Sequence, residues 1–218
     1  MQGYDRELVW LERGAHRGSP DGCLMEWVAL ISGLPKTDRP RCVNQLITSV
    51  AIHLNDTLDD VSRQRLKAFI PRLLQARRGP ADTRIGVRLA IWAAGSIAAA
   101  APERRRALHD RAVGAAREYL DGTVSETDCR AAAAEAAEAG AKAKNFALYV
   151  AADAAHAACA DDPAGAAANA LAGALHWVLR HSDPLTWFDG LLDAHAAAWV
   201  AETGASIAVT EDVVCSPA

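Results

Sequence analysis

Aromatic residues are scarce in this sequence: its 218 residues include three Phe, three Tyr and six Trp, 6% in all. β-Sandwiches and β-barrels are built from aromatic and β-branched side chains, so this composition argues against both. Long apolar runs are also absent, because Asp, Arg, Glu or His interrupts each run before the roughly 18 residues that a membrane helix needs. The sequence therefore predicts neither a β-protein nor a membrane-spanning one.

Motifs for cofactors and for export are missing as well. GxGxxG and GxxxxGK[ST], which bind nucleotide phosphates, do not occur, so we expect no cofactor. The charged N-terminus lacks the basic-then-apolar order of a signal peptide. The cysteines are odd in number and not in tight pairs, a pattern typical of the reducing cytoplasm, where we expect the protein to lie. They are Cys23, Cys42, Cys129, Cys159 and Cys215.

Alanine is what the chain has in abundance, with 49 residues, 22 of them between positions 131 and 170. Alanine has the highest helix propensity, and its small side chain lets helices approach closely. We predict an all-α protein with about eight to nine helices, arranged as a helical bundle or a stack of helical hairpins. Caps, prolines and glycines place the helices at 23–32, from near Pro40 to about 55, from 59 or 60 to a break at Pro71, and at 82–100, 103–120, 126–139, 141–160, 164–181 and 184–203.

Charge is distributed unevenly along the chain. Residues 1–120 hold 19 Lys and Arg against 13 Asp and Glu, whereas residues 121–218 hold 4 against 14. An Arg-Arg-Gly-Pro joint at 77–80 separates an N-terminal helical region, 1–80, from an alanine-rich bundle, 81–218, which form two domains or one together. A basic half packed beside an acidic half of one molecule explains the asymmetry. Head-to-tail association, or a basic face that attracts an anion, is the alternative.

Glu26 stands out because it is the only charged side chain in residues 22–35. On a helix it shares a face with Cys23. A buried carboxylate needs a cation, hydrogen-bond donors or a metal, or else its pKa rises. Three interpretations stay open: a buried ion pair between the first two helices, a catalytic or ligand-binding carboxylate, and an exposed surface group. The candidate cations are His16, Arg39, Arg41 and His53.

The second helix carries a polar stripe that contains Ser49, His53 and Asp56 at helical spacing. Hydrogen bonds along this stripe are geometrically easy, yet the sequence offers no oxyanion-hole loop or nucleophile elbow. The stripe is therefore better explained as a solvated or interface surface than as a catalytic triad. The candidate catalytic residues are Glu26, Cys23 and His53.

A metal site is a weaker hypothesis. His16, Cys23, Glu26 and Cys42 have side chains that suit zinc or iron. The sequence contains no CxxC, HExxH or ExxH motif, so we expect no metal. Asp153, His156 and Cys159 are spread around their helix, as boundary residues commonly are.

Basic residues cluster in two stretches, at 63–78 and at 104–106. Nucleic-acid recognition would require these residues on one face together with a docking element or stacking aromatics. No helix-turn-helix, zinc-finger or RNA-recognition signature accompanies them. We expect a solvated basic face and no nucleic-acid partner.

Residues 14–75 contain a Gly-Cys-x-Met-Glu helix followed by an Asp-x-Pro-x-Cys turn and an Asn-Asp pair. In these positions, which include His16 and Asn55-Asp56, the chain resembles an uncharacterised family of alanine-rich proteins from actinobacteria and their phages. Where that pattern often has a His after the Asp, this chain has Arg39. The resemblance implies an origin and assigns no activity.

These observations favour a cytoplasmic helical protein that acts through protein contacts, as a binding or regulatory module. Its partner is another protein or a second copy of itself. The alternative is a small enzyme that uses the Glu26 carboxylate with nearby Cys and His side chains. Exposure distinguishes the two, because a catalytic Glu26 points into a water-accessible pocket and a structural one is sealed.

Overall fold

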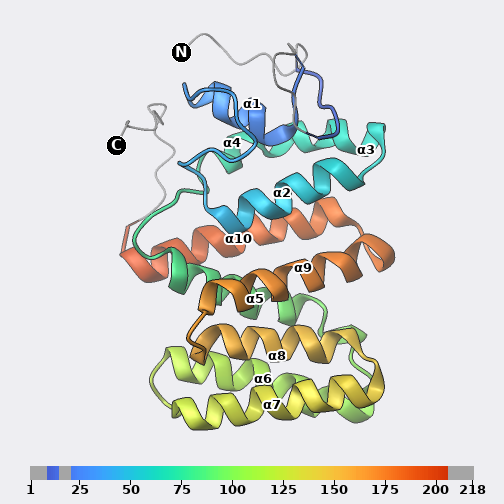
Figure 1. Ribbon diagram of the computed structural model, residues 1–218, viewed down its shortest axis with the longest axis vertical. Coiled ribbons are helices and arrows are strands. Elements are labelled where there is room, and N and C mark those ends of the chain that lie inside the picture. Colours follow the sequence, from blue (N-terminus) through green and yellow to red (C-terminus); the bar gives the residue numbers. More distant parts are fainter. Residues whose placement is uncertain (1–8, 15–20, 206–218) are drawn as a thin grey trace. The chain divides into compact units, whose positions relative to one another are not determined.

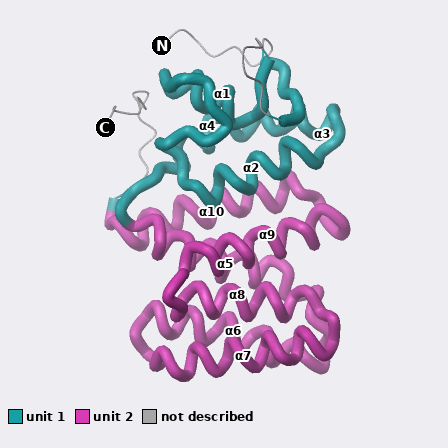
Figure 2. The backbone as a smooth tube through the Cα atoms, viewed as in Figure 1, with its two compact units in different colours: residues 1–80, 205–218 teal, residues 81–204 magenta. Residues whose placement is uncertain are grey.

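A computed structural model describes residues 9–14 and 21–205 of the chain, which form an all-α structure (Figure 1). Over these ranges the only β-type pairings are isolated bridges, Leu11 with Gly22 and Val43 with Arg77. The chain divides into two compact units: unit 1 is residues 1–80 with 205–218, and unit 2 is residues 81–204 (Figure 2). No described helix is both long enough and apolar enough to cross a membrane.

Unit 1 contains α1 (Leu24–Ile31), α2 (Gln45–Thr57), α3 (Asp60–Arg65), a short 3₁₀-helix (Leu66–Phe69) and α4 (Ile70–Leu73). The expected start of the second helix near Pro40 is wrong. Asn44 caps α2 instead, because its Oδ1 accepts from the N–H of Leu46 at 3.0 Å. The Asn44 N–H donates to the carbonyl of Ala76 at 2.8 Å, which holds the preceding residues outside the helix. Pro71 lies in the first turn of α4, where its missing N–H costs nothing.

Unit 2 contains the longer helices. They are α5 (Asp82–Ser96), a 3₁₀ turn (Ala98–Ala100), α6 (Glu103–Leu120), α7 (Glu126–Ala143), α8 (Phe146–Cys159), α9 (Pro163–His181) and α10 (Pro184–Thr203). The expected break near residue 140 is displaced. α7 continues to Ala143, Lys144 takes a left-handed conformation with φ 50°, and the Asn145 side chain caps α8.

Helix α8 is the centre of unit 2, because it packs against α5, α6, α7 and α9. Most of its buried side chains are alanines, which allow the neighbouring helices to come close. Helix α9 comes close to α8 at Gly173, where a Cβ would lie 2.6 Å from Cγ2 of Val150. The alanine-rich composition is therefore the direct cause of the tight helix packing in this unit.

Two glycine-to-alanine changes test this packing. Gly114→Ala in α6 is expected to stabilise the protein by about 1 kcal/mol, because alanine favours a helix and nothing lies within 4 Å of the added Cβ. Gly173→Ala is expected to destabilise it by about 1–3 kcal/mol, because the Cβ would overlap Val150. Urea unfolding of both variants measures the difference, and equal effects would contradict the close α8–α9 packing.

Candidate functional site

Glu26 is buried at the first turn of α1, where its side chain is 3% exposed. Its Oε2 accepts a hydrogen bond from the backbone N–H of Cys23 at 2.8 Å, so the carboxylate closes a capping box at the start of the helix. A carboxylate in this position also interacts favourably with the positive end of the helix dipole. Glu26 therefore has a structural role, which is to stabilise the start of α1.

Cys23 lies next to this carboxylate as a free, buried thiol. Burial raises the pKa of the Cys23 thiol to about 12, and the nearby Glu26 charge adds to the increase. A nucleophilic cysteine needs a lowered pKa, because the thiolate is the reactive form. At neutral pH Cys23 is therefore a protonated thiol, which suits a structural residue and not a nucleophile.

Lys36 was not among the cations expected near Glu26. Its Nζ donates to the carbonyl oxygen of Asp21. A Cβ built on Gly22 would lie 3.2 Å from Glu26 Oε2 and 3.4 Å from Lys36 Cε, so the two side chains flank the same glycine. Its position 10 residues after Glu26, across a turn, gave no helical spacing by which the sequence could have identified it.

Asn55 and Asp56, which belong to the family-like pattern, connect α2 to the start of α1 and to the segment before it. Asn55 Oδ1 accepts from the N–H of Leu24 at 3.1 Å, and its Nδ2 donates to the carbonyl of Glu12 at 2.8 Å. Asp56 Oδ1 accepts from the N–H of Gly14 at 2.8 Å. These side chains satisfy backbone groups that have no helical partner, so the pattern has a structural explanation in this chain.

The remaining candidates are not gathered around Glu26. His53 is exposed on α2, and Cys42 is disulfide-bonded. His16 lies outside the described residues. Across 9–14 and 21–205, no three His, Cys, Asp or Glu side chains come close enough to hold a metal ion.

Several of the basic residues hold the fold together. Arg63 is buried, and its guanidinium donates to the carbonyls of Asn55 at 2.7 Å and Leu58 at 2.6 Å at the end of α2. Arg105 donates to the carbonyl of Ala139 at 2.7 Å, which joins α6 to α7. The expectation of a fully solvated basic face is wrong for these two residues, because their guanidiniums complete backbone hydrogen bonding.

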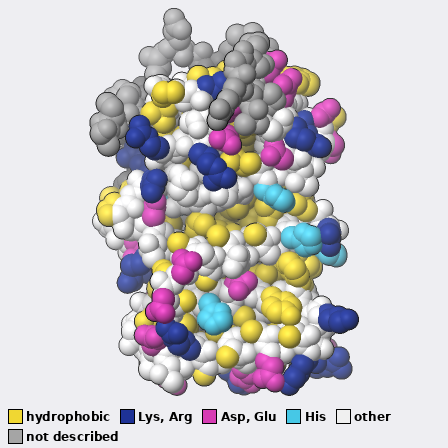
Figure 3. Space-filling view, in the orientation of Figure 1, with side chains coloured by type: hydrophobic (Ala, Val, Ile, Leu, Met, Phe, Trp, Pro, Cys, Tyr) yellow, Lys and Arg dark blue, Asp and Glu magenta, His cyan; other side chains and the backbone are white. Residues whose placement is uncertain are grey.

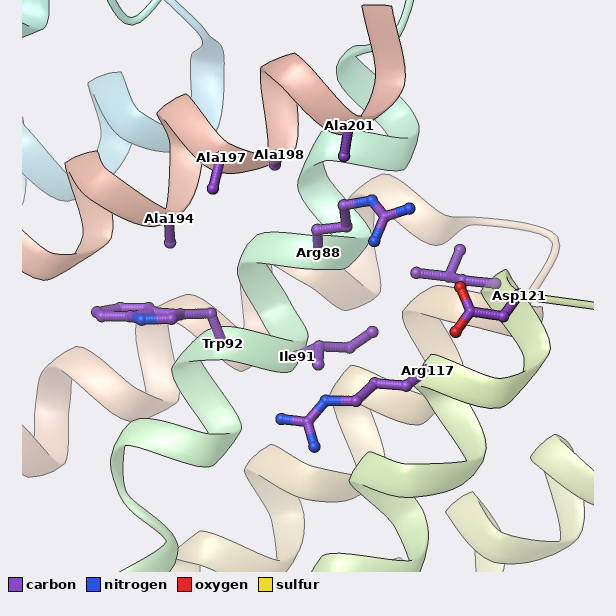
Figure 4. Close-up of a pocket in the computed structure, with 10 residues that line it drawn as sticks. Arg88, Ile91, Trp92, Arg117, Asp121, Ala194, Ala197, Ala198 and Ala201 are labelled. Carbon is purple, nitrogen blue, oxygen red and sulfur yellow. The ribbon is translucent and has the colours of Figure 1, made fainter. Parts of the chain in front are cut away.

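A pocket of about 460 Å³ opens between α5, α6 and α10 of unit 2 (Figure 4). Ile91 and Trp92 line it from α5, and alanines line it from α10. Charged side chains from two helices reach it, namely Arg88 of α5 and Arg117 of α6. The sequence did not indicate this pocket, because its residues come from three separate helices.

A second surface lies over α8 and α9, where hydrophobic side chains gather with charged ones at the margins (Figure 3). Phe146 and Tyr149 are each 41% exposed, and the Phe146 ring lies 5.3 Å from the His176 ring. We call this surface the α8–α9 face. It consists of the outward side chains Phe146, Tyr149, Asp153, His156, Ala168, Ala172, His176 and Arg180.

Comparison with known proteins gives no relative from which a role could be transferred: no protein-family model, no curated protein and no solved structure matches the chain.

Proposed function

We propose that the protein is a binding module that acts through protein contacts, and that its α8–α9 face pairs with the same face of a second copy. The observation that carries the proposal is the pair of exposed aromatic rings, Phe146 and Tyr149, beside exposed alanines on α9. Aromatic side chains are enriched at protein interfaces, and alanines allow a second helix to approach closely.

The charges at the two ends of this face are complementary. The ring contact between Phe146 and His176 places the start of α8 beside the end of α9. Lys144 and Arg180 thus lie at one end, and Asp153 lies further along α8. Among the described residues the side chains of Lys144 and Arg180 make no ion pair.

A two-fold axis near Tyr149 would bring these charges together. Lys144 precedes Tyr149 by five residues, and Asp153 follows it by four. An isologous pair places the same patch of each subunit in contact, so the cationic end of one copy meets Asp153 of the other. Self-pairing therefore uses both the apolar centre and the charges of the face.

Asp153 supports the same conclusion. It is half-buried between the alanines of α8, and burial raises the pKa of its carboxyl even though His156 acts in the opposite direction. Burial among small apolar side chains disfavours the ionised form of a carboxyl group, and a nearby cation would stabilise that form. Lys144 and Arg180 of a second copy supply such cations.

Sedimentation equilibrium tests the proposal. The wild-type protein is expected to form dimers in the micromolar range. Phe146→Ser with Tyr149→Ser is expected to raise the dissociation constant about a hundredfold, because each ring acts as an anchor. Val61→Ser on α3 removes an apolar side chain that is even more exposed, at 78%, and serves as the control that leaves the dimer unchanged. A wild-type protein that stays monomeric at these concentrations, or a double variant that dimerises normally, contradicts the proposal.

The proposal places the protein in the cytoplasm. Cys23, Cys129 and Cys159 are free thiols, which suits a reducing compartment. The disulfide at Cys42 is the feature that is more typical of an oxidising one.

A further inference from the structure

The pocket between α5, α6 and α10 has the dimensions of a small-molecule site. Its volume of about 460 Å³ lies within the usual range for such pockets. Ala194, Ala197 and Ala201 recur at helical spacing along the wall formed by α10. Because these side chains end at Cβ, the space between the three helices stays open.

The pocket combines apolar walls with guanidinium groups. Ile91 and Trp92 line it, and Trp92 packs against Trp187, whose ring centroid lies 5.3 Å away. Arg88 of α5 and Arg117 of α6 both reach the pocket, and their guanidinium groups point in different directions (Figure 4). This arrangement suits a ligand with a flat hydrophobic body and a polar group at one end.

Arg88 is held in place by Glu202 of α10. The Nε of Arg88 and the Nε of Arg84 each donate to a carboxylate oxygen of Glu202 at 2.5 Å. Burial raises the pKa of Glu202, but the two arginines lower it by more, so the net pKa lies below its usual value and the carboxylate stays ionised. The terminal nitrogens of Arg88 make no other hydrogen bond within the described part of the chain.

Arg117 is the free cation of the pocket. Its guanidinium makes no hydrogen bond or ion pair inside residues 9–14 and 21–205. Asp121, the acidic side chain at the pocket, offsets one positive charge. Three arginines against the two carboxylates of Glu202 and Asp121 leave one positive charge in excess, and one negative charge on a ligand would balance it.

We propose that this pocket binds a small monoanionic carboxylic acid with a flat hydrophobic body, whose carboxylate pairs with Arg117 and whose body lies along Trp92 and the alanines of α10. Guanidinium groups match carboxylates in shape and can donate two hydrogen bonds to one of them. This site is separate from the α8–α9 face, so it is independent of the proposed self-association.

Calorimetric titration of the full-length protein with naphthoate tests the site, and naphthamide is the matched uncharged probe. Naphthoate is expected to bind saturably with a submillimolar dissociation constant, and naphthamide at least about tenfold more weakly, since a charge-assisted hydrogen bond is lost. Equal binding of the two probes, or no saturable binding of naphthoate at millimolar concentration, overturns the proposal.

Two variants locate the binding. Arg117→Gln removes the free cation, and Ala197→Leu fills the pocket with a larger helix-favouring side chain. Both are expected to weaken naphthoate binding at least about tenfold. Arg111→Gln, on the same helix but paired with Glu135 at 2.6 Å, is the control that keeps full affinity. Unchanged affinity in Arg117→Gln and Ala197→Leu places the probe elsewhere and overturns the proposal.

Discussion

Replacing Glu26 by alanine is expected to lower the free energy of unfolding by about 3 kcal/mol, because the change leaves the buried Cys23 N–H without an acceptor and removes a charge from the helix N-terminus. The 2.8 Å hydrogen bond and the 3% exposure of the carboxylate are the basis of this value. Urea titration followed by circular dichroism measures it.

Glu26→Gln is the matched variant. An amide oxygen can still accept from Cys23, but the charge is gone, so the loss of stability is expected to be smaller than for alanine. The order wild type, glutamine, alanine identifies a structural capping residue. If both variants are as stable as the wild-type protein, the carboxylate does not stabilise α1 and its structural assignment fails.

Leu148→Ala is expected to have an effect of similar size in unit 2, about 2–5 kcal/mol, as is typical of large-to-small changes in a core. Leu148 is fully buried on α8, whose other buried side chains are mostly alanine. Its buried neighbours along α8 are mostly alanines, which are too short to close the cavity, and α8 contacts four other helices.

The control for this change is Leu30→Ala on α1, since Leu30 is 42% exposed. It removes the same atoms from a surface position and is expected to cost less than about 1 kcal/mol. Urea unfolding compares the two. A Leu148→Ala variant no less stable than Leu30→Ala would contradict the central position of α8.

The helical fold could be predicted from the sequence because the signals for helix ends are local. Ser125, Asp162 and Asp183 cap α7, α9 and α10 in the structure, close to the starts that their side chains predict. The second helix was predicted to start too early because Pro40 resembled a first-turn proline. The stronger signal was Asn44, whose side chain caps α2.

The site residues could be predicted only where the chemistry is local. Glu26 stood out because it interrupts an apolar helix. Lys36, whose side chain lies beside the same glycine as Glu26, follows it across a turn, where helical spacing does not apply. The α8–α9 face and the pocket were missed for a different reason. Each combines side chains such as Phe146 and His176, or Arg88 and Arg117, that become neighbours only when separate helices pack.

Self-pairing of the α8–α9 face is the central claim, and a charge exchange between two variants tests it most directly. One variant carries Lys144→Glu with Arg180→Glu, so both ends of its face are acidic. The other carries Asp153→Lys, so both ends are basic. Circular dichroism melts establish that each variant is folded before association is measured.

Sedimentation equilibrium of each variant alone and of their equimolar mixture is the measurement. Each variant alone is expected to be monomeric, because like charges meet across the two-fold axis, and the mixture is expected to form dimers, because opposite charges then meet at both ends. If the variants dimerise alone as the wild-type protein does, or if their mixture stays monomeric while the wild type dimerises, the proposed pairing is wrong.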